Sequence, residues 1–178
     1  MDSEDLLEVV DERNRVVGVA TRGEVHSENL MHRSAHVFLF DFEGRLFIQK
    51  RSESKDRFPL HYDSSAAGHL DAGESYPGCA IRELLEELGI EGVPLTEAAH
   101  FKACEETGWE HTSLYLCRTD DEIRINRDEI AEGGFYTLEE TEAMIEKDPP
   151  AFTSAFRLIF RWLIHNKGAF EGMIKGVR

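Results

Sequence analysis

The segment from Gly68 to Ile90 reads GHLDAGESYPGCAIRELLEELGI, and the organisation of the whole chain follows outward from it. Its first part is rich in glycine and small residues and predicts a tight turn. The turn leads into a helix expected from Tyr76 to Leu88, with Pro77 in its first turn, where a missing backbone N–H costs nothing. Gly89 is well placed to end this helix, because glycine readily adopts the left-handed conformation of a C-terminal cap.

This helix has an unusual distribution of charge. At about 100° per residue, Glu83, Glu86 and Glu87 fall on one arc of roughly 100°. Like charges three or four positions apart repel one another, and carboxylates late in a helix oppose its dipole. A divalent cation would offset both penalties, and hard oxygen ligands suit Mg²⁺ or Mn²⁺. The competing interpretation is a solvated acidic face. The residues expected on the opposite, core-facing arc are Ile81, Leu84, Leu85 and Leu88.

The spacing of the glycines and charged residues resembles the Nudix box. Gly68 is followed after five residues by Glu74, after seven more by Arg82-Glu83-Leu84, and then, after one residue each, by Glu86-Glu87 and Gly89-Ile90. The resemblance implies an α/β (α+β) fold of the Nudix type, an α/β/α sandwich with a mixed β-sheet. It also implies a hydrolase acting on phosphorus-containing acid anhydrides. Such enzymes cleave a diphosphate linkage, often one that joins a nucleoside diphosphate to another group.

The resemblance also implies the residues that bind metal. Carried over by position, Glu83, Glu86 and Glu87 resemble the Mg²⁺ ligands of the family, with Mn²⁺ as a substitute cofactor. The backbone carbonyl of Ala67 or Gly68 is the expected further ligand. Bound Mg²⁺ would neutralise charge on the diphosphate and lower the pKa of the attacking water.

Four residues are the candidates for catalytic roles. The resemblance implies an ion pair between Glu74 and Arg82, which would brace the loop against the helix. A carboxylate must accept the proton of the attacking water. Glu83 is our first candidate for this base, and Glu129, in an acidic loop, is the second. The alternative for Glu129 is a solvated loop acid.

The composition narrows the set of partners. The chain has 178 residues, which suits a single domain spanning 1–178, and a formal net charge of −15. This charge disfavours a nucleic-acid polymer or an anionic membrane, but not a small diphosphate substrate, because bound metal ions reverse the local field. Three cysteines without CxxC spacing, and an acidic N-terminus without an apolar segment, predict a cytoplasmic protein.

Apolar patterning and turn residues predict strands arranged mainly in hairpins. A β-hairpin is expected at about 6–21, ahead of the sandwich, and an amphipathic helix at about 152–167. These two elements are the candidate surfaces for a homodimer. Between them, strands are expected at 34–42, 45–51, 64–67, 99–104, 111–118 and ending at 135–136, and a helix with a capping box at 137–147.

Residues outside the box resemble one branch of the family, the isopentenyl-diphosphate isomerase-like proteins. In true isomerases, histidines and glutamates at comparable places build a metal site, and a cysteine just before the Gly-His pair transfers a proton to the alkene. Ala67 occupies that position here, so the resemblance implies a hydrolase of this branch. An isomerase-like enzyme and a non-catalytic nucleotide-binding sensor are the alternatives. The residues that carry this resemblance are His26, His32, Lys50-Arg51, Ser54-Lys55, Phe58-Pro59, Gly68-His69 and Glu110.

Five residues are the candidates for substrate binding. Lys50, Arg51 and Lys55 lie at the end of an expected strand and in the loop before the box. The geometry of the family places this loop near the pyrophosphate, where a cation would hold phosphate oxygens. The resemblance to the isomerase-like branch adds His69 and Glu110.

The histidines have two interpretations. His26, His32 and His69 are either a metal or substrate site, or a surface residue, a residue at the start of a strand and a loop contact, respectively. His36 lies inside an apolar strand and is expected to be a buried residue whose hydrogen bonds are satisfied.

Overall fold

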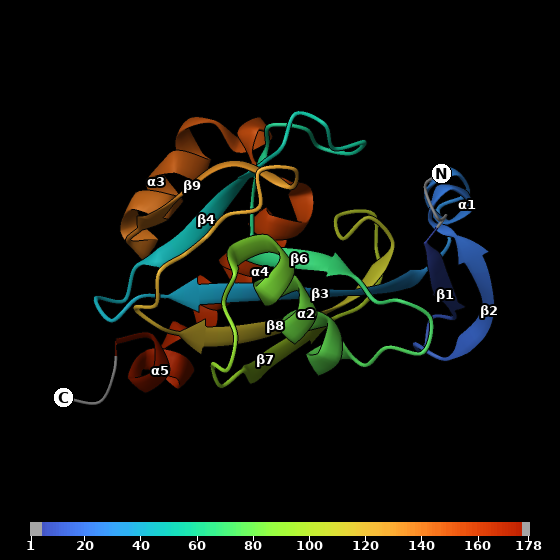
Figure 1. Ribbon diagram of the computed structural model, residues 1–178, viewed down its shortest axis with the longest axis horizontal. Coiled ribbons are helices and arrows are strands. Elements are labelled where there is room, and N and C mark those ends of the chain that lie inside the picture. The colour runs from blue at the N-terminus through green and yellow to red at the C-terminus, as the bar shows by residue number, and fades with distance from the viewer. Residues whose placement is uncertain (1–4, 176–178) are drawn as a thin grey trace.

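The computed structural model describes residues 5–175, and its centre is a seven-stranded mixed β-sheet (Figure 1). The central strand, β3 (His32–Phe40), runs parallel to β8 (Glu110–Arg118) along its whole length. The next strand, β7 (Thr96–Phe101), is antiparallel to β8 and ends this half of the sheet.

The other half of the sheet is split. The strand β6 (Ala66–His69) pairs with the first half of β3. The strand β4 (Leu46–Arg51) pairs with β3 at its last residue, Phe40. Both β5 (Tyr62–Asp63) and β9 (Ile130–Tyr136) pair with β4. The strands β6 and β4 therefore lie on either side of an opening in the sheet.

Helices cover both faces of the sheet, because side chains alternate along β3. Ala35, Val37 and Leu39 pack in one core with α2 (Tyr76–Leu88). Phe38 and Phe40 pack in a second core with α4 (Ser154–Asn166). In Figure 1, α2 lies in front of the sheet and α4 behind it. The C-terminal part of the chain also forms α3 (Leu138–Lys147), α5 (Glu171–Lys175) and the 3₁₀ turns Pro149–Ala151 and Lys167–Phe170.

An N-terminal β-hairpin stands beside this sandwich (Figure 1). Within residues 5–175, its strands β1 (Leu6–Val10) and β2 (Val16–Thr21) pair only with each other, apart from one bridge from Leu7 to Asp71. The following helix, α1 (Arg22–Ser27), begins at Thr21, whose side chain forms a capping box with Glu24. His26 lies in this helix, which places it at the end of the sheet.

The predicted α/β/α sandwich, mixed sheet and N-terminal hairpin are confirmed, but several element boundaries differ. The strand expected at 99–104 is β7, which pairs with β8 from Thr96 to Phe101. The strand expected at 64–67 is β6, which begins two residues later. The C-terminal helix begins at Ser154, because Thr153 caps it by accepting the N–H of Phe156. None of the helices within residues 5–175 is both long and apolar enough to cross a membrane.

Candidate active site

Arg82 joins the loop before α2 to the helix. Its Nε and Nη2 donate to the two carboxylate oxygens of Glu74, each at 2.9 Å, and Nη2 also donates to the carbonyl of His69 at 3.0 Å. This double contact lowers the pKa of Glu74 and raises that of Arg82. The remaining nitrogen, Nη1, donates to Glu83 at 2.7 Å and to Glu86 at 3.2 Å. The ion pair expected between Glu74 and Arg82 is therefore formed.

Glu83 is pressed against the backbone of β6. A methyl group added to Gly68 would lie 1.8 Å from Glu83 Oε1, so only glycine allows this approach. The side chain is buried, with 8% of the residue exposed. Burial raises the pKa of Glu83 to about 7, and the charges of Glu86 and Glu129 add to the rise, although Arg82 opposes it.

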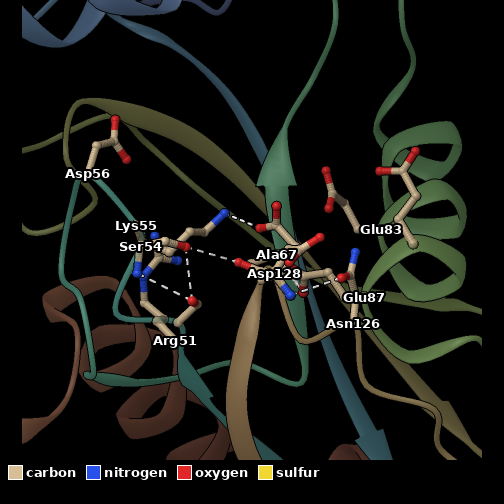
Figure 2. A network of polar contacts seen from close by, with 12 residues as sticks. Arg51, Ser54, Lys55, Asp56, Ala67, Glu83, Glu87, Asn126 and Asp128 are labelled. Atoms are coloured by element: carbon tan, nitrogen blue, oxygen red, sulfur yellow. Dashed lines mark hydrogen bonds and ion pairs between the residues drawn. The ribbon is translucent and has the colours of Figure 1, made fainter. Parts of the chain in front are cut away.

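Glu87 lies deeper between α2 and the opening in the sheet. Its Oε2 accepts hydrogen bonds from Gln49 Nε2 at 2.8 Å and from the N–H of Ala67 at 3.2 Å. Burial and the charge of Glu83 raise the pKa of Glu87 to about 8, despite these bonds. Glu86 is the exposed member of the three. Figure 2 shows Glu83 and Glu87 directed from α2 toward the strand that carries Ala67.

Of the four residues expected on the core face of α2, Leu84 and Leu88 are buried but Ile81 and Leu85 are not, and the interpretation of the glutamates as a solvated acidic face is wrong for Glu83 and Glu87. Ile81 and Leu85 are 55% and 49% exposed, whereas only 4% of Glu87 is exposed. The helix contacts the sheet through Leu84 and Leu88 at one end of an arc and through Glu83 and Glu87 at the other. The glycine at position 68 and the opening in the sheet leave room for the carboxylates there.

Glu129 belongs to the same acidic cluster but is paired. It forms an ion pair with Lys55, which lies in the loop after β4. The charge of Glu129 contributes to the raised pKa of Glu83, so the two carboxylates are neighbours. Asn126, in the loop that carries Glu129, donates its backbone N–H to the Glu87 carbonyl at 2.8 Å and so joins this loop to α2.

These carboxylates fit a divalent cation. Glu83, Glu86, Glu87 and Glu129 all line one cavity and carry hard oxygen atoms, which are the ligands that Mg²⁺ prefers. The carbonyl of Gly68, a further expected ligand, receives a long contact from the Cys79 thiol at 3.5 Å.

A cavity of about 410 Å³ connects the acidic cluster with most of the expected substrate-binding residues. Arg51, Lys55, His69 and Glu110 line it. Arg51 is held by Asp63 at 3.4 Å and by the Arg57 carbonyl at 3.0 Å.

Lys50 is not among the residues that line this cavity. It pairs with Glu132 at 3.1 Å and lies over the ring of Tyr62. Because adjacent residues of a strand point to opposite faces, Lys50 and Arg51 are directed apart.

Three histidines form a second cluster at the end of the sheet. The ring nitrogens that His26, His32 and His69 offer all lie within 4.8 Å of one another. Glu110 Oε1 lies 3.1 Å from His69 Nε2 and 3.5 Å from His32 Nε2. The Nε2 atoms of His26 and His32 are buried and have no hydrogen-bond partner among the described residues.

Two of the three histidines, His26 and His69, favour the neutral imidazole. Burial, His69 and Arg57 together lower the pKa of His26 to about 4, and burial lowers that of His69. Neutral imidazole is the form that binds transition metals. The interpretation of His26 as an ordinary surface histidine is therefore wrong, because α1 places it against the other two rings.

Sequence reasoning missed several side chains of this site. Gln49, which holds Glu87, Asp63, which holds Arg51, and Asn126 have no motif that distinguishes them. Their positions depend on pairing between strands and loops far apart in the chain. His36 is buried and bonded to Ser64 as expected, and it also lines the cavity.

Known proteins similar to this chain were found by sequence. A family model described as the NUDIX domain matches residues 30–156. An uncharacterized Nudix hydrolase of Yersinia pestis is 33% identical over 168 residues, which cover 94% of this chain and 91% of the relative. Isopentenyl-diphosphate Delta-isomerase 2 of Photorhabdus laumondii is 28% identical over 165 residues, covering 90% of this chain and 93% of the relative.

Solved structures are similar as well. A crystal structure of a Deinococcus radiodurans protein matches with a TM-score of 0.73 and 30% identity, covering 81% of this chain and 90% of the other. The NUDIX domain of Shewanella oneidensis NrtR, crystallised with ADP ribose, matches with a TM-score of 0.62 over 83% of this chain and 99% of the other. At 13% identity, the second match shows similarity of fold alone.

Proposed function

Because the chain belongs to the Nudix hydrolase family, whose members hydrolyse pyrophosphate bonds, we propose that it cleaves a diphosphate linkage in a small molecule with Mg²⁺ as cofactor. The substrate we propose is a nucleoside diphosphate joined to another group, or a related small diphosphate. The observation that carries the proposal is the pair of buried carboxylates, Glu83 and Glu87, held against Gly68 and Ala67 beside a cavity.

In this proposal, Glu83, Glu86 and Glu87 hold the metal. When bound, Mg²⁺ supplies positive charge to the diphosphate oxygens and lowers the pKa of water. Arg82 fixes the position of Glu83 from the protein side while its bidentate bond to Glu74 keeps the loop closed on the helix. The metal ligands are thus positioned before substrate arrives, which reduces reorganisation during the reaction.

Proton transfer is assigned to Glu83. It is the carboxylate that lies against the backbone of β6, and in the metal-free protein burial raises its pKa to about 7. Glu129 is the second candidate, but its carboxylate is already engaged by Lys55. Lys55 and Arg51 then bind the oxygens of the phosphates, because both line the same cavity as the carboxylates.

The proposal is tested by steady-state hydrolysis with Mg²⁺ and with Mn²⁺ over a panel of nucleoside diphosphates, dinucleotides, nucleotide sugars, coenzyme A and prenyl diphosphates. For any substrate turned over, Glu83→Gln and Glu87→Gln should each lower kcat by about 100-fold or more. Glu91→Gln, an exposed acid just after α2, is the matched control and should leave kcat unchanged. Unchanged turnover in both site variants would refute the assignment of these ligands.

A second candidate function is isomerisation of a prenyl diphosphate, which the histidine cluster with Glu110 and the isomerase relative favour. The structure weakens it, because Ala67 has no thiol and no other cysteine replaces one. Cys79 is buried in α2 with its thiol directed at the carbonyls of Gly68 and His69, and burial raises its pKa far above neutrality. Incubation of isopentenyl diphosphate in deuterated water should therefore leave the recovered diphosphates unlabelled.

The histidine cluster has a role of its own in the proposal, as a second metal site. Neutral imidazoles with one carboxylate suit Mn²⁺, Co²⁺ or Zn²⁺. Elemental analysis of protein dialysed against these ions should show one ion fewer in His32→Ala than in wild type. Equal metal content in the two proteins would show that the three histidines do not bind a metal ion.

Two further expectations complete the proposal. A non-catalytic nucleotide sensor would bind the same panel without turnover, so metal-dependent hydrolysis excludes it. The cytoplasmic location remains a prediction from the sequence; the three cysteines, Cys79, Cys104 and Cys117, are free in the structure.

A further inference from the structure

Arg57 is an arginine of the cavity wall whose guanidinium contacts a histidine. Its Nη1 lies 2.8 Å from His26 Nδ1, and both residues line the cavity. Within residues 5–175 the guanidinium forms no ion pair with a carboxylate, although the chain has a net charge of −15. The neighbouring carboxylate of Asp56 pairs with Arg22, at 3.1 Å. The charge of Arg57 is therefore available to an anionic ligand.

The contact with Arg57 determines where the ring of His26 carries its proton. A guanidinium only donates hydrogen bonds, so His26 Nδ1 must be the acceptor. A protonated imidazole would present an N–H at both nitrogens and could not accept, so the ring is neutral. Its proton is then on Nε2, the buried nitrogen that has no hydrogen-bond partner among the described residues.

His32 carries its ring proton on the other nitrogen. Its Nδ1 lies 2.9 Å from the carbonyl of Leu30, which only accepts, so Nδ1 donates and Nε2 of the neutral ring is bare. The rings of His26 and His32 lie 5.3 Å apart between centroids. Because a metal ligand must be a bare nitrogen, His32 Nε2 is prepared to bind an ion and His26 Nε2 is not.

The contact with Arg57 and ligation through Nε2 exclude each other at His26. The ring can offer a bare Nε2 only after it has lost that proton to water and gained another at Nδ1, with no net change. Its Nδ1–H would then face an N–H of Arg57, donor against donor. The guanidinium must therefore leave His26 when this ring becomes a ligand.

The backbone of Arg57 is held, so the change is confined to its side chain. Its carbonyl accepts hydrogen bonds from Arg51 Nε at 3.2 Å and from Arg51 Nη2 at 3.0 Å. Arg51 and Lys55, which is two residues earlier in the same loop, line the same cavity. A guanidinium released from His26 thus stays in the wall that carries the proposed phosphate-binding residues, where it can form charge-assisted hydrogen bonds.

We propose that Arg57 couples an ion at the histidine cluster to binding of the diphosphate. Without the ion, Arg57 is held on His26; once His26 is a ligand, the guanidinium of Arg57 binds phosphate oxygens beside Lys55. This inference rests on the proposed function, both for the diphosphate and for the histidines as a metal site. The coupling is reciprocal, so the diphosphate also tightens binding of the ion.

The first experiment measures Zn²⁺ affinity by calorimetric titration of the full-length protein in excess Mg²⁺, with His32→Ala to identify Zn²⁺ bound elsewhere. Arg57→Gln should bind Zn²⁺ about tenfold more tightly than wild type, because the amide oxygen accepts the Nδ1–H of His26. Arg22→Gln is the matched control, since it removes the same charge from the same cavity. Its effect should be clearly smaller.

Nitrogen NMR of the imidazole rings reports the tautomer directly. The ring of His26 should carry its proton on Nε2 in protein without Zn²⁺ and on Nδ1 after one equivalent has bound. A proton that stays on Nε2 in the Zn²⁺-loaded protein would overturn the exclusion between the two contacts.

The coupling itself is measured with α,β-methylene-ADP, a nucleoside diphosphate that resists hydrolysis. With Mg²⁺ present, one equivalent of Zn²⁺ should tighten its binding to wild type by about tenfold. The same addition should have no effect on Arg57→Gln or His32→Ala and should keep its full effect on Arg22→Gln. Circular dichroism of each variant confirms that it is folded.

The outcomes separate the two proposals. The role of Arg57 would be overturned by equal gains of Zn²⁺ affinity in Arg57→Gln and Arg22→Gln, by no gain, by wild-type nucleotide affinity that ignores Zn²⁺, or by a Zn²⁺ effect that persists in Arg57→Gln. Absence of hydrolysis of any diphosphate, with the coupling intact, would overturn the proposed function and leave the role of Arg57 standing.

Discussion

At the scale of single residues, Gly68 decides the geometry of the site. Its backbone lies where a side chain would overlap the Glu83 carboxylate, so the position requires glycine for a steric reason. The buried carboxylate that results has a raised pKa, and its position beside β6 is the consequence of a missing methyl group.

Gly68→Ala should lower kcat by about tenfold or more, because a displacement of about 1 Å at a reacting group is costly. Thermal unfolding should show a loss of stability as well. Gly18→Ala is the matched control, since an added methyl there meets nothing within 4 Å. Full activity of Gly68→Ala would mean that Glu83 works from a different position.

The raised pKa values of Glu83 and Glu87 predict how stability depends on pH in metal-free protein. Between the unfolded value of 4.5 and the folded values of about 7 and about 8, the native state retains protons that the unfolded state has lost. The free energy of unfolding should therefore fall as pH rises through this window. Urea unfolding in EDTA from pH 5 to pH 8.5 measures the slope.

Glu87→Gln should flatten this slope and raise the free energy of unfolding at pH 8.5 by on the order of 2 kcal/mol. Glu91→Gln, exposed and outside the cavity, should keep the wild-type slope. A slope that is the same in wild type and Glu87→Gln would show that Glu87 is ionised without cost.

At the scale of elements, α2 buries a mixed face. Ala80, Leu84 and Leu88 pack on the sheet, and Glu83 and Glu87 continue the same buried surface toward the opening between β6 and β4. Helical periodicity alone predicts that the apolar residues and the glutamates lie on opposite arcs of the helix. The contact of Glu87 with Gln49 on β4 shows why the helix is rotated: the sheet offers it a hydrogen-bond donor.

Leu84→Ala and Leu85→Ala form a matched pair that tests this rotation. Leu84 is fully enclosed, so its truncation should cost about 2–5 kcal/mol of unfolding free energy. Leu85 is half-exposed, and its truncation should cost less than about 1 kcal/mol. Chemical denaturation of both variants gives the comparison. Equal losses of unfolding free energy would show that Leu84 and Leu85 are equally buried, as a simple amphipathic helix predicts.

At the scale of the whole molecule, the split sheet makes the site. The cavity is bordered by β6, by the end of β4, by α2 and by the start of α4, so that acidic, basic and histidine groups from distant parts of the sequence line one space. The net charge of −15 makes this concentration of carboxylates costly without a cation.

Addition of Mg²⁺ should therefore raise the melting temperature of wild type in a concentration-dependent way. The triple variant Glu83→Gln, Glu86→Gln, Glu87→Gln should melt at a higher temperature than metal-free wild type and should not respond to Mg²⁺. Differential scanning calorimetry of the two proteins measures both effects. A triple variant that still responds to Mg²⁺ would place the ion elsewhere.

The homodimer remains a prediction at this scale. The outer edge of β2 carries no charged residue, and Val17 and Val19 on it are exposed. Such an edge is open to pairing with a second copy. Light scattering should report a dimer that Val17→Lys dissociates; an unchanged mass of that variant would exclude the hairpin as the interface.

The sequence by itself determined the class of fold, the box from Gly68 to Ile90 and the Glu74–Arg82 brace, because these depend on spacings of a few residues within one turn and one helix. Only the tertiary structure decided that Glu83 and Glu87 are buried, that three histidines and Glu110 meet, and that His36 faces a cavity. Those outcomes depend on which strands pair and in which register, and so on contacts between residues far apart in the chain that no local periodicity records.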